Sequence, residues 1–224
     1  MIPSNIEAVI FDFDGVIVDT EEIGIDVSYR LMKKQFGIEL TKEEKNMFYG
    51  LQDLLFYQRL IGKYGLDVKP HQLLQHHNQE YDAAIVRVNS TLPGVVDLLK
   101  NIRKNRIAAA ICSGSYESQI QIVLNNLGLA GYFDAITNCE ETANHKPHPE
   151  PYLVTAQKLK VSPRNCAAIE DSENGITSAK NAGMYCVGVT IGNHGTQNLI
   201  GADVIIYSLR ELKLNSRSPP HQKL

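Results

Sequence analysis

Four short segments of the sequence carry side chains that are able to do chemistry. In the first, Asp12 and Asp14 are two carboxylates separated by one residue. The other three segments are Ser113-Gly114-Ser115, His145-Lys146-Pro147 and Glu170-Asp171-Ser172. Paired carboxylates suit a hard cation together with nucleophilic or acid/base work, whereas hydroxyl and N–H groups before a helix suit an anion. The set predicts a site that binds both a metal cation and an anionic group.

Each segment alone also has a purely structural explanation. An Asp after a strand often caps a helix, a Ser-Gly-Ser sequence often forms a turn, and a Lys-Pro pair often lies in a surface loop. Their joint order is more specific than any one of them, because a strand ends in Asp-x-Asp-Gly, another ends in Ser, a Lys-Pro follows, and a further strand ends in Glu-Asp. We therefore interpret the four segments as one site.

The elements that must position this site form a repeating pattern. Continuous apolar stretches predict strands buried on both faces of a parallel sheet, and the longer intervals between them show helical periodicity. The stretches cover residues 8–11, 107–112, 135–136, 166–169, 186–189 and 204–206. This alternation predicts an α/β fold, a doubly wound (Rossmann-like) parallel sheet. The carboxyl ends of its strands meet at one edge, where ligands bind.

The pattern changes between the first and second strands. Residues 20–90 contain no strand-like stretch and read as consecutive helices, with a capping-box signature at Thr41 and Glu44 and with Pro70 at a first helical position. The sequence thus predicts a discontinuous α/β core, residues 1–19 and 91–214, interrupted by an all-helical domain. Residues 215–224 hold two prolines and no periodicity, so we expect a loose C-terminal tail.

With these motifs, nearly the whole chain resembles the haloacid dehalogenase superfamily, in particular its β-phosphoglucomutase-like subgroup with an inserted helical cap. The resemblance implies a cap over the substrate at residues 20–90 and phosphoryl transfer through an aspartyl-phosphate. It implies these roles: Asp12 as nucleophile; Asp14 as general acid/base; Ser113, Gly114 and Lys146 as phosphate ligands; and Asp12, Glu170, Asp171 and the main-chain carbonyl of Asp14 as ligands of Mg²⁺.

Branches of this superfamily differ in a few residues. Asp14 disfavours the dehalogenase branch, which lacks a second Asp. In the mutase branch a His and an Arg hold a second phosphate, and the matching positions here are Gly24 and Asp53. The phosphonatase branch needs a cap lysine, and none lies near Asp53, although Arg59 and Lys63 remain open as cations that move into the site.

Composition limits the remaining classes of function. The 224 residues are 43% hydrophobic and carry a formal net charge of −3, so a soluble globular protein without a nucleic-acid footprint is expected. No apolar stretch long enough to span a membrane occurs, and the N-terminus does not resemble an export signal. Four widely spaced cysteines fit a reducing cytoplasm. We interpret His76, His77, His145 and His148 as solvated rather than as metal ligands.

The function expected from these observations is that of a Mg²⁺-dependent phosphatase. Its substrate is expected to be a small phosphorylated metabolite, a sugar or organic-acid phosphate. Two alternatives remain open: phosphoryl transfer of the β-phosphoglucomutase type, and a non-catalytic protein that binds a phosphorylated metabolite. The sequence gives no oligomeric state.

Overall fold

The computed structural model describes residues 2–48, 51, 53–191 and 198–214, so the expected tail at 215–224 lies outside the described residues. The strands are β1 (Ala8–Phe11), β2 (Ala108–Cys112), β3 (Ala135–Thr137), β4 (Cys166–Glu170), β5 (Tyr185–Val189) and β6 (Val204–Ile206). The helices are α1 (Glu21–Phe36), α2 (Lys42–Phe48), α3 (Asp53–Tyr64), α4 (Pro70–Ile85), α5 (Val95–Lys104), α6 (Glu117–Leu127), α7 (Glu150–Leu159) and α8 (Glu173–Asn181). The doubly wound α/β fold expected from the sequence is confirmed.

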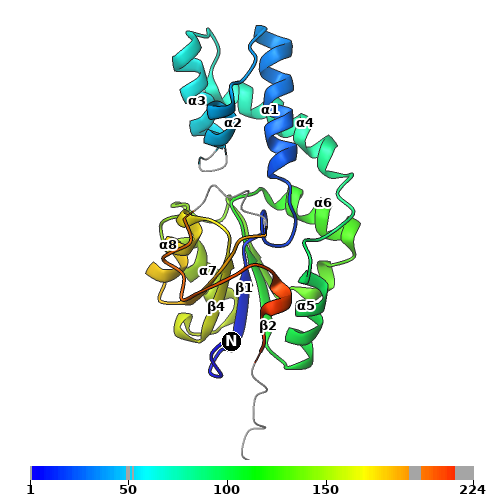
Figure 1. Cartoon of the computed structure of the whole chain (residues 1–224), viewed down its shortest axis with the longest axis vertical. Helices are drawn as coiled ribbons and strands as arrows, with labels where there is room; N and C mark the ends of the chain where they lie inside the picture. Colours follow the sequence, from blue (N-terminus) through cyan, green and yellow to red (C-terminus); the bar gives the residue numbers. More distant parts are fainter. Residues whose placement is uncertain (1, 49–50, 52, 192–197, 215–224) are drawn as a thin grey trace, which may run out of the picture.

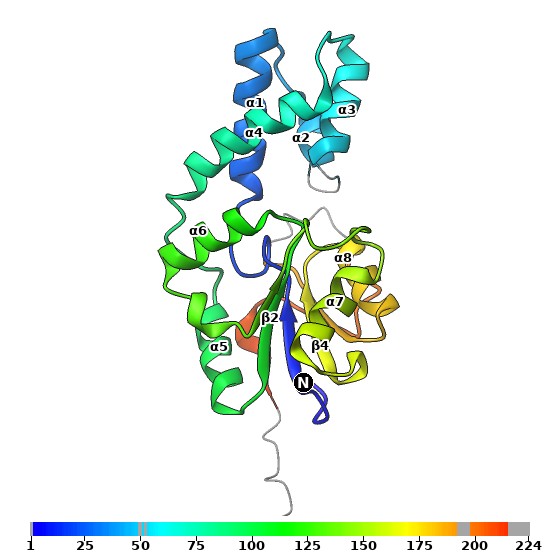
Figure 2. The ribbon, with the colours of Figure 1, turned by 180° about the vertical axis from the view of Figure 1, so that it is seen from behind.

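All six strands form one parallel sheet in the order β3-β2-β1-β4-β5-β6. The first strand is therefore central, and the chain winds outward from it in both directions. Helices α5 and α6 lie on one side of the sheet and α7 and α8 on the other (Figure 1), an arrangement that the opposite view in Figure 2 repeats. The switch in winding direction beside β1 is where open α/β sheets bind their ligands.

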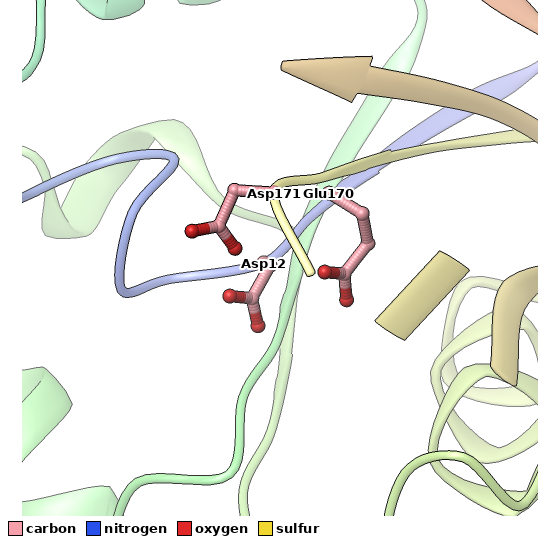
Figure 3. A group of neighbouring side chains, drawn as sticks. All are labelled: Asp12, Glu170 and Asp171. Atoms are coloured by element: carbon pink, nitrogen blue, oxygen red, sulfur yellow. The ribbon is translucent and has the colours of Figure 1, made fainter. Parts of the chain in front are cut away.

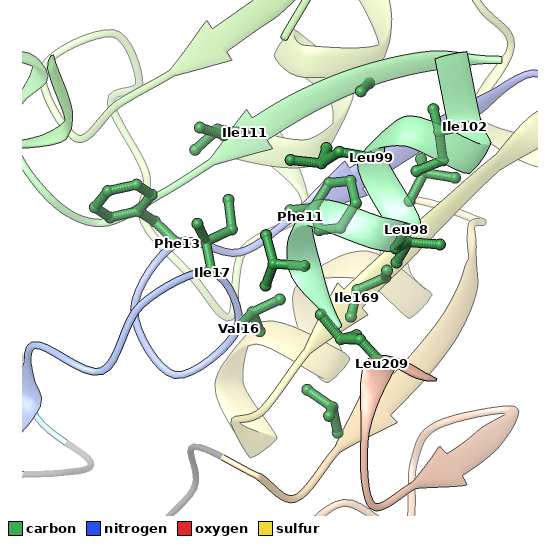
Figure 4. Close-up of a cluster of buried hydrophobic side chains, with 14 of the residues drawn as sticks. Phe11, Phe13, Val16, Ile17, Leu98, Leu99, Ile102, Ile111, Ile169 and Leu209 are labelled. Carbon is green, nitrogen blue, oxygen red and sulfur yellow. The ribbon is translucent and has the colours of Figure 1, made fainter. Parts of the chain in front are cut away.

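The two faces of the sheet have different cores. On the α5 and α6 face, Phe11 and Ile111 pack with Leu98 and Leu99 (Figure 4). The other face uses small strand residues such as Ala168 and Cys112 against α7 and α8. Because successive strand residues point to opposite faces, a strand covered on both sides is apolar throughout. This is why the continuous apolar stretches located the strands so well.

Helices α1 to α4 follow β1 and stand beyond the carboxyl ends of the strands (Figure 1). They have an apolar cluster of their own, which includes Leu31, Phe56 and Leu73. The predicted capping box is present, since the N–H of Glu44 donates to the Thr41 hydroxyl and the N–H of Thr41 donates to the Glu44 carboxylate. Pro70 begins α4 as predicted.

One histidine interpretation is wrong. His77 is buried, with its side chain 2% exposed, whereas His76, His145 and His148 are exposed. The Nδ1 atom of His77 hydrogen-bonds with the hydroxyls of Ser28 and Tyr57, and its ring stacks on Tyr81. Burial lowers the pKa of His77 to about 4. The sequence could not show this, because the partners come from three different helices.

Within the part of the chain that the structure describes, no helix has both the length and the apolar character needed to cross a membrane.

Candidate active site

Strand register places the acidic segments beside each other. Phe11 of β1 is paired with Ile111 of β2 and with Ile169 of β4. The next residue of each strand, which is Asp12, Cys112 or Glu170, therefore lies at the same level. One residue further along come Phe13, Ser113 and Asp171. Residues more than a hundred positions apart in the sequence thus reach the same edge of the sheet.

Lys146 connects the first and last acidic segments. Its Nζ donates to Asp12 Oδ1 at 2.6 Å, to Glu170 Oε1 at 2.6 Å and to the Cys112 carbonyl at 2.9 Å. An ammonium has three N–H donors, so these three contacts use all of them. Burial lowers the pKa of Lys146, but attraction to the two carboxylates raises it well above its usual range. Lys146 is therefore a permanent cation inside the acidic cluster.

Three buried carboxyl groups lie together at this edge. One oxygen from each of Asp12, Glu170 and Asp171 lies within 4.8 Å of the others, and Figure 3 shows Asp12 between the other two. Burial and then the charge of neighbouring acids raise the pKa of Asp171 well above its usual range. For Asp12, burial and the charges of Glu170 and Asp14 outweigh Lys146 and raise the pKa to about 7. One lysine does not neutralise the negative charge of three carboxylates, whereas an additional divalent cation that prefers oxygen ligands would.

The residues fit such a cation unequally. Glu170 is fully buried; its Oε1 also accepts from the Tyr152 hydroxyl at 2.6 Å, and its Oε2 accepts from the Ser172 hydroxyl at 3.1 Å. Its hydrogen-bonding capacity is thus spent largely on protein groups, and Glu170 anchors Lys146. Asp12 and Asp171 have more free oxygen sites toward the pocket, so they are the residues best able to hold Mg²⁺.

Two glycines allow this close packing. Gly15 has φ +75°, and a Cβ on it would lie 1.9 Å from Asp171 Oδ2. A Cβ on Gly175 would lie 2.0 Å from the Glu170 carboxyl. Gly15 also adopts a left-handed backbone that other residues rarely adopt. The glycine of the first acidic segment is therefore required both by the turn and by the carboxylate against it.

Asp14 has different surroundings from Asp12. Its Oδ2 accepts from the Ser115 hydroxyl at 2.7 Å, and its Oδ1 accepts from the Thr20 hydroxyl. Burial raises the pKa of Asp14, while these two hydrogen bonds oppose the rise. A carboxyl group that keeps its proton to higher pH is suited to donate it. The two aspartates are thus distinguished by their partners, a lysine for one and two hydroxyls for the other.

Ser113 and Gly114 follow β2 and precede α6. Ser113 is buried, and its hydroxyl accepts from the Ser115 N–H at 3.0 Å. Both residues line the same pocket as Asp12. No atom lies within 4 Å of the position that a Cβ on Gly114 would take, so packing does not require a glycine there. Their place before the N-terminus of α6 suits an anion.

The acidic edge opens into a cavity of about 540 Å³. Its floor contains the predicted residues Asp12, Asp14, Ser113, Gly114, Lys146 and Asp171. Its opposite wall comes from the helical region and includes Gly24, Phe48, Asp53, Leu54, Leu74, His77 and Tyr81. Glu170 lies behind the floor, and neither Arg59 nor Lys63 is among the described lining residues. Lys63 pairs with Glu44 instead, at 2.8 Å.

Gly24 and Asp53 are the two positions that match the His and the Arg of the mutase branch. The space beside Gly24 is filled by the Phe48 ring, since a Cβ at Gly24 would lie 2.9 Å from Phe48 Cζ. Asp53 begins α3, and its Oδ2 lies 3.9 Å from Nε2 of His77. Both positions line the cavity, but one lies against the Phe48 ring and the other is acidic.

Sequence reasoning missed three residues of the site. Thr20 precedes α1 but makes no side-chain cap; its hydroxyl donates to Asp14 instead. Ser115 was expected to help Ser113 and Gly114 bind an anion rather than to donate to Asp14. No motif indicated a role in the site for Tyr152. Each is a common residue in a common position, and its role depends on a contact across elements that leaves no local signal.

Comparison with known proteins agrees with this geometry. The chain matches the haloacid dehalogenase-like hydrolase family over residues 9–189. It is 32% identical to the β-phosphoglucomutase of Bacillus subtilis, covering 93% of this chain and 92% of that protein. It is 30% identical to the fructose-1-phosphate phosphatase YqaB of Escherichia coli, covering 81% of this chain and 95% of that protein.

Among solved structures, the β-phosphoglucomutase of Clostridium difficile superposes with a TM-score of 0.80 at 32% identity, covering 93% of each chain. The fold of nearly the whole chain is therefore shared with that enzyme. The chain belongs to the haloacid dehalogenase-like hydrolase family.

Proposed function

We propose that this hydrolase is a Mg²⁺-dependent phosphatase that releases phosphate from a small phosphorylated metabolite, a sugar or organic-acid phosphate, through an aspartyl-phosphate on Asp12. The observation that carries the proposal is the pair of aspartates in one cavity: Asp12 bonded to Lys146, and Asp14 bonded to two hydroxyls. One carboxylate is prepared to attack and the other to exchange a proton.

In the first step, an Asp12 oxygen attacks phosphorus, the bond between phosphorus and the ester oxygen breaks, and Asp14 gives its proton to the departing alkoxide. The Thr20 and Ser115 hydroxyls hold Asp14 for this transfer. Lys146 reduces the negative charge that Asp12 presents to the incoming phosphate. Ser113 and Gly114, before α6, bind the phosphoryl oxygens, and the positive charge of Lys146 beside Asp12 attracts them.

In the second step, Asp14 removes a proton from water, the water oxygen attacks the phosphorus of the aspartyl-phosphate, and Asp12 is regenerated with release of phosphate. Bound Mg²⁺ supplies positive charge that lets an anionic nucleophile approach an anionic ester. Asp12 and Asp171 would hold it, with the Asp14 carbonyl as a further ligand and Glu170 at the edge of the cluster. The protein's own contribution is to place Asp12 for attack on the phosphorus and Asp14 for proton transfer to the leaving oxygen and from water.

We further propose that residues 20–90 act as a cap on a core formed by residues 1–19 and 91–214. The support is that this segment has its own apolar cluster and supplies the wall of the cavity opposite the acids. The relatives named as a sugar phosphatase and a sugar phosphate mutase support a small phosphorylated substrate. Four free cysteines support a cytoplasmic location.

A β-phosphoglucomutase activity is the second candidate, because relatives with that name align over nearly the whole chain. A mutase must hold a bisphosphate intermediate, which needs a cation away from the reacting phosphorus. Here Phe48 fills the space at Gly24, and Asp53 places a carboxylate at the other position. Both features favour hydrolysis.

The test is a panel of phosphate esters incubated with Mg²⁺, with release of inorganic phosphate measured for the wild type and Asp12→Asn. We expect release by the wild type alone. The panel includes β-glucose 1-phosphate with a trace of its bisphosphate: efficient formation of glucose 6-phosphate would support the mutase instead. Tight binding of esters without any turnover would support the non-catalytic alternative.

A further inference from the structure

The charged groups around the cavity are strongly unbalanced. Among the described residues that line it, Lys146 is the one Lys or Arg side chain, and it is already bonded to Asp12 and Glu170. The lining acids are Asp12, Asp14, Glu21, Asp53, Glu140 and Asp171. A divalent cation and the phosphate of a substrate offset each other in charge, so the remainder of the substrate still faces an acidic wall.

Asp53 is the lining acid that α3 contributes to the wall opposite the floor. It comes from the helical region, at the first residue of α3, and 40% of its side chain is exposed. Burial within the cavity and the charge of Asp14 raise its pKa to about 6. The carboxylate is thus charged above neutral pH. No cation compensates it, since the basic atom nearest to it among the described groups is Nε2 of His77, at 3.9 Å.

His77 does not supply the missing positive charge. The ring is buried and its pKa is lowered to about 4, so the imidazole is neutral at physiological pH. Its Nδ1 bonds with the Ser28 and Tyr57 hydroxyls, which fix the ring beside Asp53. Phe48, Leu54, Leu74 and Tyr81 add apolar and aromatic surface to this wall, which also includes the polar residues Glu21, His71 and Asn78. The wall therefore combines a carboxylate, which accepts hydrogen bonds from hydroxyl groups, with aromatic and aliphatic surface.

From this juxtaposition we propose that the cavity selects phosphate monoesters whose alcohol part is uncharged and hydroxylated, and that Asp53 is the specificity-determining residue that rejects a second anionic group. This inference rests on the proposed function and narrows it: within sugar and organic-acid phosphates, it favours the sugars and sugar alcohols. Bisphosphates and phosphorylated carboxylic acids place an anion against the Asp53 carboxylate.

The physical basis is repulsion in a partly dehydrated space. Two like charges a few ångströms apart near a protein surface cost enough to change affinity by about 10- to 100-fold. An uncharged hydroxyl group is not repelled by the Asp53 carboxylate, and it donates a hydrogen bond to that carboxylate instead. Asn in place of Asp53 keeps the shape and the preference for a helix N-terminus while removing the charge.

The experiment compares substrates that share a carbon skeleton, at about pH 8, where an ordinary histidine is neutral. The pairs are glucose 6-phosphate with 6-phosphogluconate, and fructose 1-phosphate with fructose 1,6-bisphosphate. Wild type, Asp53→Asn and Asp67→Asn are measured with Mg²⁺. Asp67 is an exposed acid of the helical region outside the cavity, so its variant is the control for net charge.

We expect the wild type to favour the uncharged member of each pair by about 10- to 100-fold in kcat/KM. Asp53→Asn should reduce that preference about tenfold, mainly through a lower KM for the anionic member, and Asp67→Asn should leave it unchanged. Equal kcat/KM within the pairs, or a preference that survives in Asp53→Asn, overturns the inference.

The affinities of the four compounds can also be measured without turnover. Calorimetric titration of Asp12→Asn with the same four compounds, at the same pH with Mg²⁺, should show the same order of affinities. If no ester is hydrolysed by the wild type, the proposed function fails while these affinities still decide the selectivity. If esters are hydrolysed but the affinities within each pair are equal, the selectivity alone fails.

Discussion

The two walls of the cavity are built in different ways. The floor is made from residues directly after adjacent strands, so sheet register fixes Asp12, Glu170 and Asp171 relative to one another. The opposite wall comes from helices joined to the core by the chain around Thr20 and around residue 90, and its residues are positioned by helix packing. In the proposed function, the floor carries the groups for the reaction, and we expect the wall to contact the rest of the substrate.

This difference indicates where substitutions are tolerated. On the floor, a Cβ at Gly15 or Gly175 would overlap a carboxyl group, so small substitutions disturb the acids directly. On the wall, Gly24 and Asp53 occupy positions where related enzymes with another activity are expected to carry other side chains. We therefore assign the phosphoryl-transfer chemistry to the floor, and the choice of substrate and of hydrolysis over mutase activity to the wall. The following predictions test that separation.

Removal of the metal should have the largest effect, because it unbalances the floor. A chelator should abolish turnover of every ester, and Mg²⁺ should restore it, since the candidate ligands are all oxygen atoms. Asp171→Asn should need a much higher Mg²⁺ concentration, whereas Asp67→Asn should behave as the wild type. Full activity of dialysed protein in chelator would contradict the assignment of Asp12 and Asp171.

Replacement of Asp14 should reduce the rate of enzyme phosphorylation by a factor that depends on the leaving group. General acid catalysis contributes ~10²–10⁴-fold for a poor leaving group such as a sugar alkoxide, whereas p-nitrophenolate leaves with little protonation. Asp14→Asn should thus slow phosphorylation of the enzyme much more for a sugar phosphate than for p-nitrophenyl phosphate. The measurement is single-turnover, because Asp14 also serves the second step. Equal losses for the two esters would leave Asp14 only a structural role.

Ser115→Ala should have a smaller effect, which appears in the pH profile. The Ser115 hydrogen bond lowers the pKa of Asp14, so its removal raises that pKa further. An acid works only while protonated, so its activity falls as pH rises through the pKa, and a higher pKa moves this fall to higher pH. We expect phosphorylation about tenfold slower, with its alkaline limb shifted upward. Ser90→Ala, at an exposed site, is the control, and an unshifted limb would contradict the role of Ser115.

Much of the floor could be predicted from the sequence because its causes are local. Apolar stretches located the strands, and an acid directly after a buried strand reaches the ligand-binding edge whatever the rest of the chain does. Asp12, Asp14, Ser113 and Asp171 line the cavity as expected for residues that follow buried strands, and Lys146 joins them from the loop between β3 and α7. Their catalytic roles remain predictions.

The rest depended on contacts between distant elements. His77 was interpreted as solvated because no Cys or third His lies at a metal-binding spacing from it, yet Ser28, Tyr57 and Tyr81 bury it. Glu170 lies within the acidic cluster as grouped with Asp171, but the sequence did not indicate that the Tyr152 hydroxyl and the Lys146 ammonium both bond to its Oε1. Packing partners of this kind are set by tertiary structure, which no short motif encodes.

The most direct test of the central claim is to trap the phosphorylated enzyme. The protein is mixed with a phosphate ester and Mg²⁺, quenched in acid within one turnover, digested, and analysed by mass spectrometry. We predict a phosphoryl group on the peptide containing Asp12, more of it in Asp14→Asn with p-nitrophenyl phosphate because the second step is slowed, and none in Asp12→Asn. Turnover without a phosphorylated intermediate, or a phosphoryl group on Ser113 instead of Asp12, would contradict the account.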